Sequence, residues 1–374
     1  MGYNEKLMAQ LSIGIVGLPN VGKSTLFNAL LKRTVADAQN YPFCTIEPNV
    51  GIIEVPDARL PKLRDLVHAQ AILPAVVEFY DIAGLVRGAS TGEGLGNKFL
   101  AHIREVAAIV HVVRLFDDNN IIHVDNKVDP AADILTIDSE LALADLATLE
   151  KYKEPRGSAG KEDIARYAVV QKIRGPLNEG IAVRAQSLTS EELELLKPLN
   201  LLTVKPVIFA FNVSEEQLMN ADAIKTQIEQ VFQSSNYELA TTNYIYLCAK
   251  LENDVLGLSD EDQQEYLEQF GLSETGLNRL VKESYKALKL MSYLTAGEKE
   301  VRAWTIPMGT LAPQAAGVIH TDFEKKFIKA DVVKYQDFMD HGGWTGARAA
   351  GRVGIMGRDY VMEEDDIVEF KIGA

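Results

Sequence analysis

The stretch Gly17-Leu18-Pro19-Asn20-Val21-Gly22-Lys23-Ser24-Thr25 decides the fold of this chain. It matches the P-loop form G-x-x-x-x-G-K-[ST], and it stands between an apolar run, Ile13–Val16, and a helical pattern that begins at Thr25. Glycines let the backbone approach phosphate oxygens closely, and the loop N–H groups with the following helix N-terminus supply positive potential. The sequence therefore predicts a phosphate-binding loop. Its predicted nucleotide contacts are Asn20, Val21, Gly22, Lys23, Ser24 and Thr25.

Two later segments are predicted to complete the phosphate and metal site. Lys23 would reach the β- and γ-phosphates as a catalytic cation, and the Ser24 hydroxyl would bind Mg²⁺. Thr45, in a loop bounded by prolines, and Asp81, at the end of the apolar run Val76–Tyr80, are the other predicted metal ligands. The Gly84 N–H is predicted to contact the γ-phosphate. Loss of that phosphate would release the Thr45 loop, as in an order–disorder switch.

The residue after this motif departs from Ras-like proteins, where a glutamine orients the attacking water. Leu85 has no polar group, so another residue must place the water if hydrolysis occurs. His123 is a candidate catalytic residue because histidine can orient or deprotonate water near neutral pH. The other interpretation is a loop histidine with a structural hydrogen bond. His111 lies inside an apolar strand pattern, and we expect it to be packed in the core.

Asn20 offers a second source of positive charge at the phosphates. A P-loop of the form Gly-x-Pro-Asn-x-Gly-Lys-Ser resembles those of GTPases that use a bound K⁺ in place of an arginine finger. The alternative is an asparagine selected only for turn geometry. The sequence leaves both interpretations open.

The predicted base-binding motif also departs from guanine-specific proteins, which carry Asn-Lys-x-Asp. Here an apolar strand ends in Asn212-Val213-Ser214-Glu215, so the lysine is absent and the carboxylate is one methylene longer. A displaced carboxylate would not meet N1–H and N2–H₂ of guanine in the same place, whereas adenine has neither donor. We expect Asn212 to contact the base edge, Val213 to line the ring and the Ala249 N–H to contact the base. The motif predicts a preference for ATP, or at least a loss of GTP selectivity.

Composition and charge restrict the class of protein. The chain has 374 residues, 47% apolar and 24% charged, which is typical of a soluble globular protein with two or three domains. A formal charge of −15 argues against nonspecific nucleic-acid binding by the whole surface. No apolar run is long enough to span a membrane, and no signal-peptide pattern precedes the first strand. We expect a cytoplasmic protein with reduced thiols at Cys44 and Cys248.

Apolar runs alternate with helical patterns through the first two thirds of the chain. Most of these runs are nearly continuous, as in strands that are buried on both faces of a largely parallel sheet. This pattern predicts an α/β P-loop nucleoside-triphosphatase core. The predicted strands are Ile13–Val16, Gly51–Val55, Val76–Tyr80, Ile109–Phe116, Pro206–Phe211 and Tyr244–Cys248.

A helical segment interrupts this alternation. Apolar residues recur at helical spacing from Ile134, a second helical stretch covers Lys161–Asn178, and Thr189-Ser190-Glu191-Glu192 has capping-box form. From about Met291 the pattern changes to short strands, a helix over Gln314–Phe323 and turns. The predicted domains are a nucleotide-binding domain of residues 11–133 and 206–288, an inserted helical domain of residues 134–205, and a C-terminal domain of residues 289–374.

Taken together, these motifs resemble the Obg-related P-loop (TRAFAC) GTPases, and within them the YchF subfamily of Obg-like ATPases. The resemblance covers nearly the whole chain. Its markers are Gly17–Thr25, Asn40–Pro48, Asp81–Gly96, Asn212–Glu215, Arg302–Pro307 and His320–Lys325. It implies an ATP- or GTP-hydrolysing Mg²⁺ enzyme with an ATP preference, a hydrophobic residue at Leu85 and a water-positioning histidine at His123. It also implies ribosome association, an inserted helical domain and a C-terminal β-grasp (TGS) domain of the kind found in RNA-associated proteins.

The resulting hypothesis is a monomeric, Mg²⁺-dependent ATPase that converts ATP to ADP and acts as a switch on a ribosomal partner. RNA contact is expected through the TGS domain and through the helical arm; in the TGS domain, Lys325, Lys326 and Lys329 would form either a basic spot or an ordinary solvated face. One alternative is a GTPase with true guanine preference. Another is a scaffold that binds nucleotide and hydrolyses almost none, which Leu85 favours.

Overall fold

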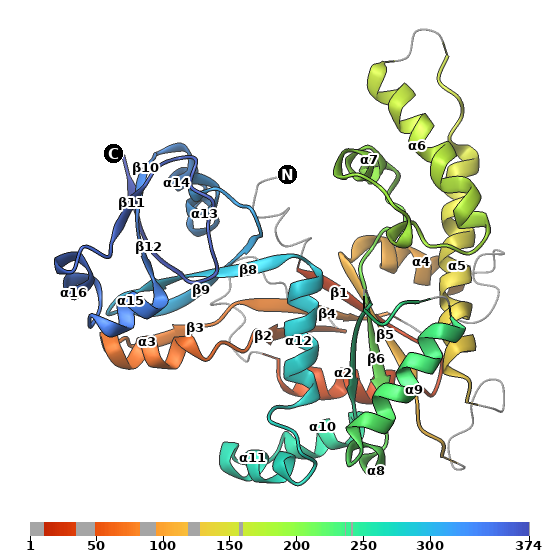
Figure 1. Ribbon diagram of the computed structural model, residues 1–374, viewed down its shortest axis with the longest axis horizontal. Helices are drawn as coiled ribbons and strands as arrows, with labels where there is room; N and C mark the ends of the chain where they lie inside the picture. Colours follow the sequence, from red (N-terminus) through yellow and green to blue (C-terminus); the bar gives the residue numbers. More distant parts are fainter. Residues whose placement is uncertain are drawn as a thin grey trace. The chain divides into compact units, whose positions relative to one another are not determined.

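The structure is a computed structural model, and it describes residues 11–34, 49–82, 95–118, 128–156, 160–235, 237–240 and 242–373. The chain forms two compact units. The unit that we call the P-loop unit contains Ser12–Lys32 and Phe79–Arg279. The C-terminal unit contains Arg33–Glu78 and Leu280–Ala374, together with the chain up to Leu11. Their strands and helices are labelled in Figure 1.

Four parallel strands, β1, β5, β6 and β7, form the centre of the P-loop unit. β1 pairs with β5, β5 with β6 and β6 with β7, all in parallel, and the full strand order is β2-β4-β1-β5-β6-β7. Every residue of β1, β5 and β6 is buried, which explains why these strands are continuous apolar runs. The strands are β1 (Ser12–Val16), β2 (Val50–Glu54), β4 (Val76–Asp81), β5 (Ala108–Arg114), β6 (Val207–Asn212) and β7 (Asn243–Leu247). The six predicted strands and the predicted α/β fold class are confirmed.

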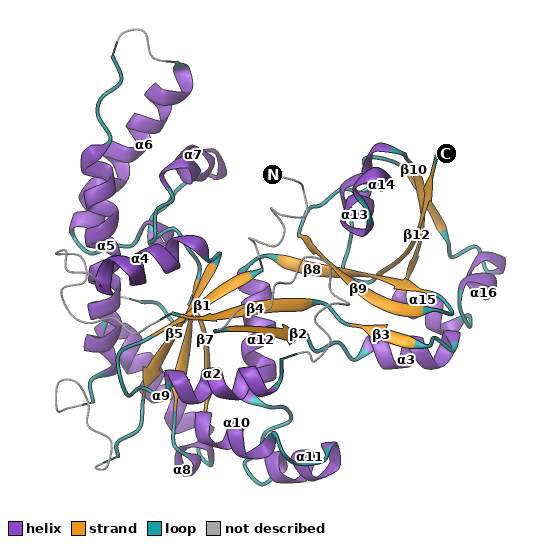
Figure 2. Cartoon of the chain, turned by 180° about the vertical axis from the view of Figure 1, so that it is seen from behind, coloured by secondary structure: helices purple, strands orange, loops and turns teal. Residues whose placement is uncertain are grey.

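Helices surround this sheet, as Figure 2 shows. They are α2 (Lys23–Lys32), α4 (Leu95–Glu105), α8 (Glu215–Leu218), α9 (Ala221–Ser234), α10 (Ala249–Val255), α11 (Asp260–Glu268) and α12 (Gly276–Ala287). α2 begins inside the P-loop, and α8 and α10 begin just after β6 and β7. Because parallel strands end at the same edge of a sheet, these helix starts gather where α/β proteins bind nucleotides.

The inserted segment forms a helical arm with its own small core. It contains α5 (Pro130–Lys151), α6 (Lys161–Asn178), η3 (Val183–Ala185), α7 (Ser190–Leu196) and η4 (Lys197–Leu199). Leu149 of α5 packs with Val170 and Ile173 of α6 in a buried apolar cluster. α6 spans the predicted Lys161–Asn178, and Thr189 and Glu192 form the predicted capping box at the start of α7.

Two polar clusters fix the geometry at the base of this arm. Both carboxylate oxygens of Asp145 on α5 accept hydrogen bonds from backbone N–H groups, one from Leu202 and one from Thr203, each at 2.8 Å. Asp138, also on α5, accepts from Arg184 and from the hydroxyl of Tyr237, each at 2.7 Å. Buried polar groups that are fully hydrogen-bonded hold one geometry, so these contacts give the arm a defined base.

The C-terminal unit is a mixed sheet with strand order β11-β10-β12-β8-β9-β3. Its strands are β3 (Ala71–Leu73), β8 (Leu290–Ala296), β9 (Glu300–Pro307), β10 (Phe327–Lys334), β11 (Gly354–Met356) and β12 (Asp366–Ile372). Its helices are α3 (Arg59–Val67), α13 (Ala312–Ile319), α14 (Thr321–Lys325), α15 (Tyr335–Asp340) and α16 (Trp344–Ala349). The predicted helix over Gln314–Phe323 begins earlier and is interrupted at His320, whose backbone is extended and caps α14.

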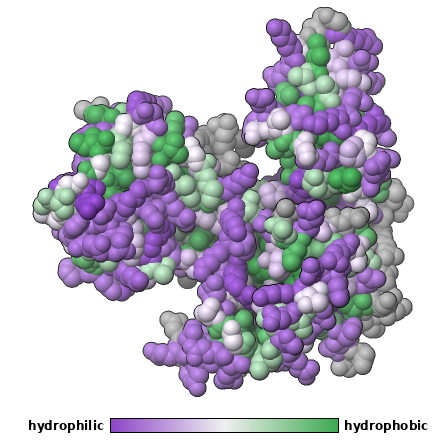
Figure 3. Space-filling view, in the orientation of Figure 1, coloured by the Kyte–Doolittle hydropathy of each residue, from purple (hydrophilic) through white to green (hydrophobic). Residues whose placement is uncertain are grey.

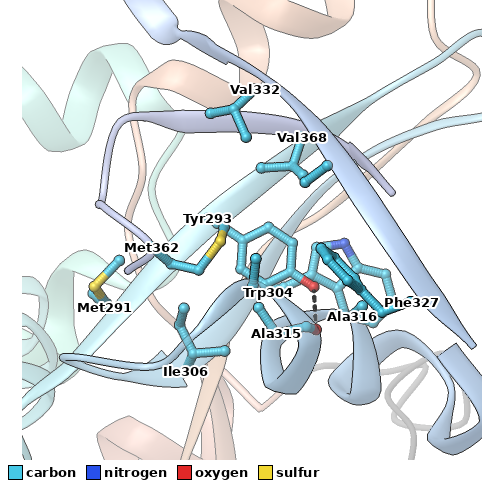
Figure 4. Close-up of a cluster of buried hydrophobic side chains, with 12 residues drawn as sticks. Met291, Tyr293, Trp304, Ile306, Ala315, Ala316, Phe327, Val332, Met362 and Val368 are labelled. Carbon is cyan, nitrogen blue, oxygen red and sulfur yellow. Dashed lines mark hydrogen bonds between the residues drawn. The ribbon is translucent and has the colours of Figure 1, made fainter. Parts of the chain in front are cut away.

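Aromatic side chains form the core of this unit. Tyr293 of β8 lies near Trp304 of β9, with ring centroids 6.5 Å apart, and its hydroxyl donates to the Ala315 carbonyl of α13 at 2.9 Å. Figure 4 shows this hydrogen bond inside the apolar cluster. The tyrosine therefore joins the sheet to the helix while its polar end is satisfied.

The compact units divide the chain at different places from the domain boundaries proposed from sequence. β3 pairs in parallel with β9, from Ala71↔Glu300 to Leu73↔Arg302. This pairing places α3 and β3, which lie inside the proposed nucleotide-binding domain of residues 11–133, in the C-terminal unit. α3 and β3 fall in the C-terminal unit because β3 pairs with a strand more than 200 residues later in the chain. Local sequence patterns do not indicate such long-range pairing.

Some large apolar side chains are exposed at the surface. Figure 3 shows green patches scattered among polar surface, including the arm, where Leu143 and Ile164 are exposed. Within the described ranges, no helix is both long enough and apolar enough to cross a bilayer.

Candidate nucleotide-binding site

Two glycines of the P-loop stand where no side chain fits. A Cβ on Gly17 would lie 2.7 Å from the Val112 carbonyl oxygen, and one on Gly22 would lie 2.1 Å from Asn212 Nδ2. Gly22 also has a φ of +96°, which other residues rarely adopt. Close packing therefore leaves no room for a side chain at either glycine. The P-loop continues directly into the N-terminus of α2.

Asn20 has a φ of 64°, in the left-handed region that asparagine tolerates better than most residues. This conformation agrees with an asparagine selected for turn geometry. It does not decide between that interpretation and a K⁺ ligand, because one residue can serve both roles.

Lys23 and Asp81 lie together although they are 58 residues apart in the chain. The Lys23 ammonium forms an ion pair with the Asp81 carboxylate, and their side chains are 12% and 24% exposed. Asp81 is therefore at the P-loop, and Ser24 is exposed at the start of α2 beside it. A carboxylate and a hydroxyl are hard oxygen ligands, and protein sites for Mg²⁺ often supply only one or two of them beside phosphate. The residues present fit the metal that P-loop nucleotide hydrolases generally use.

Asn212 joins the P-loop to the loop after β7. Its side-chain Nδ2 donates to the Val21 carbonyl at 3.0 Å, and its Oδ1 accepts from the Ala249 N–H at 3.0 Å. The side chain is buried, and its residue is only 5% exposed. Asn212 thus brings three predicted nucleotide contacts together and uses both ends of its amide to do so. The predicted contact of Asn212 with the base stays a prediction.

The other base-motif residues lie around this amide. Val213 is buried, and its N–H donates to the Leu247 carbonyl at 2.9 Å. Glu215 begins α8, and its carboxylate pairs with Lys250 Nζ at 3.2 Å. Cys248 precedes α10 as a buried free thiol, and burial raises its pKa. The structure therefore gathers Val21, Asn212, Val213, Glu215 and Ala249 at one edge of the sheet.

Three predicted site residues lie outside the described residues: Thr45, Gly84 and His123. The same holds for Leu85 and Cys44. Their predicted roles therefore rest on the sequence.

Comparison with known proteins finds relatives that match almost the full length of this chain. A family model described as a 50S ribosome-binding GTPase matches residues 12–145. A model of a YchF-GTPase C-terminal domain, described as a protein of unknown function (DUF933), matches residues 290–373. The ribosome-binding ATPase YchF of Bacillus subtilis (strain 168) is 47% identical over 367 residues, which are 96% of this chain and 99% of that protein. The chain belongs to the YchF family.

Other YchF proteins agree with this assignment. The ribosome-binding ATPase YchF of Escherichia coli O157:H7 is 48% identical over 96% of this chain and 98% of its own length. The solved structure of the Schizosaccharomyces pombe YchF GTPase superposes with a TM-score of 0.83 at 39% identity, covering 97% of this chain and 98% of that one. The fold predicted from the motifs is thus that of a YchF P-loop protein with its C-terminal domain.

The structure also adds two side-chain contacts that the motifs of the YchF family did not identify, one beside the base motif and one at the opposite edge of the parallel sheet. Gln217 of α8 completes a capping box with Ser214, and its side-chain amide donates to the Leu115 carbonyl at 3.2 Å. Lys205 Nζ donates to the carbonyls of Arg104 and Val106 at the end of α4, and burial lowers its pKa to about 8. The Ser-x-x-Gln spacing could have predicted the capping box of Ser214 and Gln217. No local sequence signal predicts the bonds of Lys205.

His111 is packed in the core of the sheet, as its sequence context predicts. It is 2% exposed, its ring centroid lies 5.5 Å from that of Phe209, and its Nε2 has no hydrogen-bond partner among the described residues. Burial lowers its pKa to about 4 from an ordinary value of 6.5. His111 therefore stays neutral in the folded chain where the unfolded chain would bind a proton.

This depressed pKa predicts a loss of stability in mild acid. Between pH 6.5 and pH 4 the unfolded chain binds one more proton at this site, so the free energy of unfolding should fall by about 3 kcal/mol. Urea denaturation at closely spaced pH values measures this slope. His111→Phe should remove this part of the slope, whereas His68→Asn, at an exposed left-handed position, should keep it. An unchanged slope in His111→Phe would contradict the prediction.

Proposed function

We propose that this chain is a Mg²⁺-dependent ATP hydrolase that acts as a nucleotide switch on the ribosome. The observation that carries the hydrolase proposal is the P-loop with Lys23 beside Asp81, joined through Asn212 to the base motif. The names of the bacterial relatives, ribosome-binding ATPases, support the substrate and the partner. A ribosomal partner also supports a cytoplasmic location. We further propose that the chain acts as a monomer, with RNA contacts through the C-terminal unit and the arm.

The residues have distinct proposed roles in hydrolysis. Lys23 donates to β- and γ-phosphate oxygens, and Ser24, Thr45 and Asp81 hold the metal site. A Mg²⁺ ion held by these oxygen ligands would neutralise negative charge on the phosphates. The Gly84 N–H contacts the γ-phosphate, and His123 orients the attacking water, since Leu85 has no polar group to do so. A K⁺ at Asn20 is proposed as an activator; equal turnover in KCl and NaCl would exclude it.

The preference for adenine rests on Glu215, which replaces the shorter aspartate of guanine-specific motifs. A GTP-hydrolysing switch is the second candidate, and the matching description as a GTPase favours it. Steady-state turnover of both nucleotides, with and without ribosomes, separates the two. We expect a higher kcat/KM for ATP. A higher value for GTP would replace the first proposal by the second, and no turnover of either would leave a nucleotide-binding scaffold.

His123 supplies a sharper test of the mechanism. His123→Ala should reduce ATP turnover by about 100-fold, the lower end for loss of a group that positions or deprotonates a reactant. ADP affinity should stay within about twofold of wild type, because the imidazole is proposed to contact water and not the bound product. His102→Asn on the exposed side of α4 is the matched control and should turn over normally. Normal turnover in His123→Ala would remove this histidine from the mechanism.

A further inference from the structure

Two helix starts face each other at the base-binding end of the site. β6 and β7 are parallel neighbours in register, with Asn212 opposite Leu247. α8 begins at Glu215 just after β6, and α10 begins at Ala249 just after β7. Lys250 is the second residue of α10, and its ammonium lies 3.2 Å from Glu215 Oε1.

Both helix starts have restrained backbones. The Ser214 side chain accepts from the Gln217 N–H, and the Gln217 side chain accepts from the Ser214 N–H at 2.9 Å, which closes a capping box at α8. The Ala249 N–H is held by Asn212. With the backbones held, the direction of the Glu215 carboxylate depends on its own rotamer and on its ion pair.

This ion pair involves the carboxylate that stands where guanine-specific proteins bind the base. The Glu215 side chain is 33% exposed and the Lys250 side chain is 74% exposed, so the pair is accessible to water. Hydrogen bonding to Glu215 raises the pKa of Lys250. A carboxylate that already accepts from an ammonium must give up that contact before it can accept from guanine N1–H and N2–H₂.

Adenine does not require this exchange. Its corresponding edge has no N1–H and no 2-amino group, so it does not compete for Glu215 oxygens. The ion pair therefore lowers the affinity for one base and leaves the other unaffected. Discrimination by a polar group depends on whether that group is available in the right place, and Lys250 controls the availability.

We propose that Lys250 is a specificity-determining residue that keeps Glu215 in an ion pair and thereby disfavours guanine nucleotides. The inference deepens the proposed function, because it explains an adenine preference by a second residue beside Glu215. The pair is exposed to water, so its effect is modest. We expect the affinity ratio to change by about three- to fivefold, as for an exposed ion pair.

Equilibrium titration of the full chain with fluorescent N-methylanthraniloyl ADP and GDP, in the presence of Mg²⁺, tests this directly. Lys250→Met keeps the aliphatic stem and removes the charge, and it should raise the affinity for GDP relative to ADP by about three- to fivefold. Lys250→Arg keeps a cation and should keep the wild-type ratio. Lys225→Met, at another exposed lysine on α9, is the matched control. High salt should move the wild type toward the Lys250→Met ratio and leave that variant unchanged.

The double variant E215A/K250M identifies the group responsible. If Lys250 acts through the Glu215 carboxylate, the gain in GDP affinity should disappear when that carboxylate is absent. An unchanged ratio in Lys250→Met, or a gain that persists in the double variant, would overturn the inference. Because diphosphate binding is measured without turnover, this result is independent of the hydrolysis assays that test the proposed function.

Discussion

Replacing Gly22 with alanine is expected to weaken nucleotide binding by at least about 100-fold, equivalent to about 3 kcal/mol. The new Cβ would lie 2.1 Å from Asn212 Nδ2, at a residue whose φ is +96°. Asn212 cannot simply turn away, since it is buried and its amide is bonded to Val21 on one side and Ala249 on the other. Displacing it leaves buried backbone groups unsatisfied, at a cost of about 1–3 kcal/mol each.

A matched variant separates the close contact from backbone strain. Gly180 has a similar φ of +85°, but a Cβ there meets nothing within 4 Å. Gly180→Ala should therefore lower the free energy of unfolding by about 1 kcal/mol and leave nucleotide affinity unchanged. Isothermal titration with ADP measures both variants. A Gly22→Ala chain that binds ADP within about threefold of wild type would contradict the proposed coupling between the P-loop and Asn212.

Replacing Lys23 with methionine should reduce ATP turnover by about 100- to 1,000-fold, the effect of removing one preorganised donor from a developing negative charge. The structure places this ammonium beside Asp81, so the same change also leaves the carboxylate without its cation. Because both side chains retain some exposure, the loss of stability should be small next to the loss of turnover. Single-turnover hydrolysis at saturating ATP measures the chemical effect.

The other end of the same helix supplies the control for this variant. Lys32 ends α2 and donates to Asn253 Oδ1 at 2.6 Å, away from the P-loop. Lys32→Met should turn over ATP within about twofold of wild type, because it touches no predicted phosphate contact. If Lys23→Met hydrolysed ATP as fast as Lys32→Met, the assignment of Lys23 as the catalytic cation would be wrong.

The tertiary structure changes how the base motif should be understood. From sequence, Asn212 is predicted to contact the base. Glu215 takes the place of the aspartate of guanine-specific motifs, with a side chain one methylene longer. In the structure, the Asn212 amide joins the P-loop to the start of α10, and Glu215 is paired with Lys250. If the proposed role of Lys250 is correct, base specificity in this YchF chain should depend on side-chain pairing across two helix starts as well as on the length of one side chain.

Local patterns in the sequence determined most of the architecture. Fully buried parallel strands leave continuous apolar runs, so β1, β5 and β6 were predictable, and the bounds of α6 and the cap at Thr189 follow from helical periodicity and hydrogen-bond chemistry. The P-loop glycines follow from the motif and the burial of His111 from its strand pattern, whereas the contacts that exclude a Cβ at Gly17 and Gly22, with Val112 and Asn212, are long-range.

Only the tertiary structure decided which distant residues meet. The Lys23–Asp81 pair, the Asn212 bridge and the Glu215–Lys250 pair join segments whose separation in sequence carries no signal of contact. The same is true of β3, whose three residues join β9 across more than 200 positions and so belong to the C-terminal unit. Side-chain periodicity reports which face of an element is buried, but not the partner that buries it, and that partner sets the chemistry of this site.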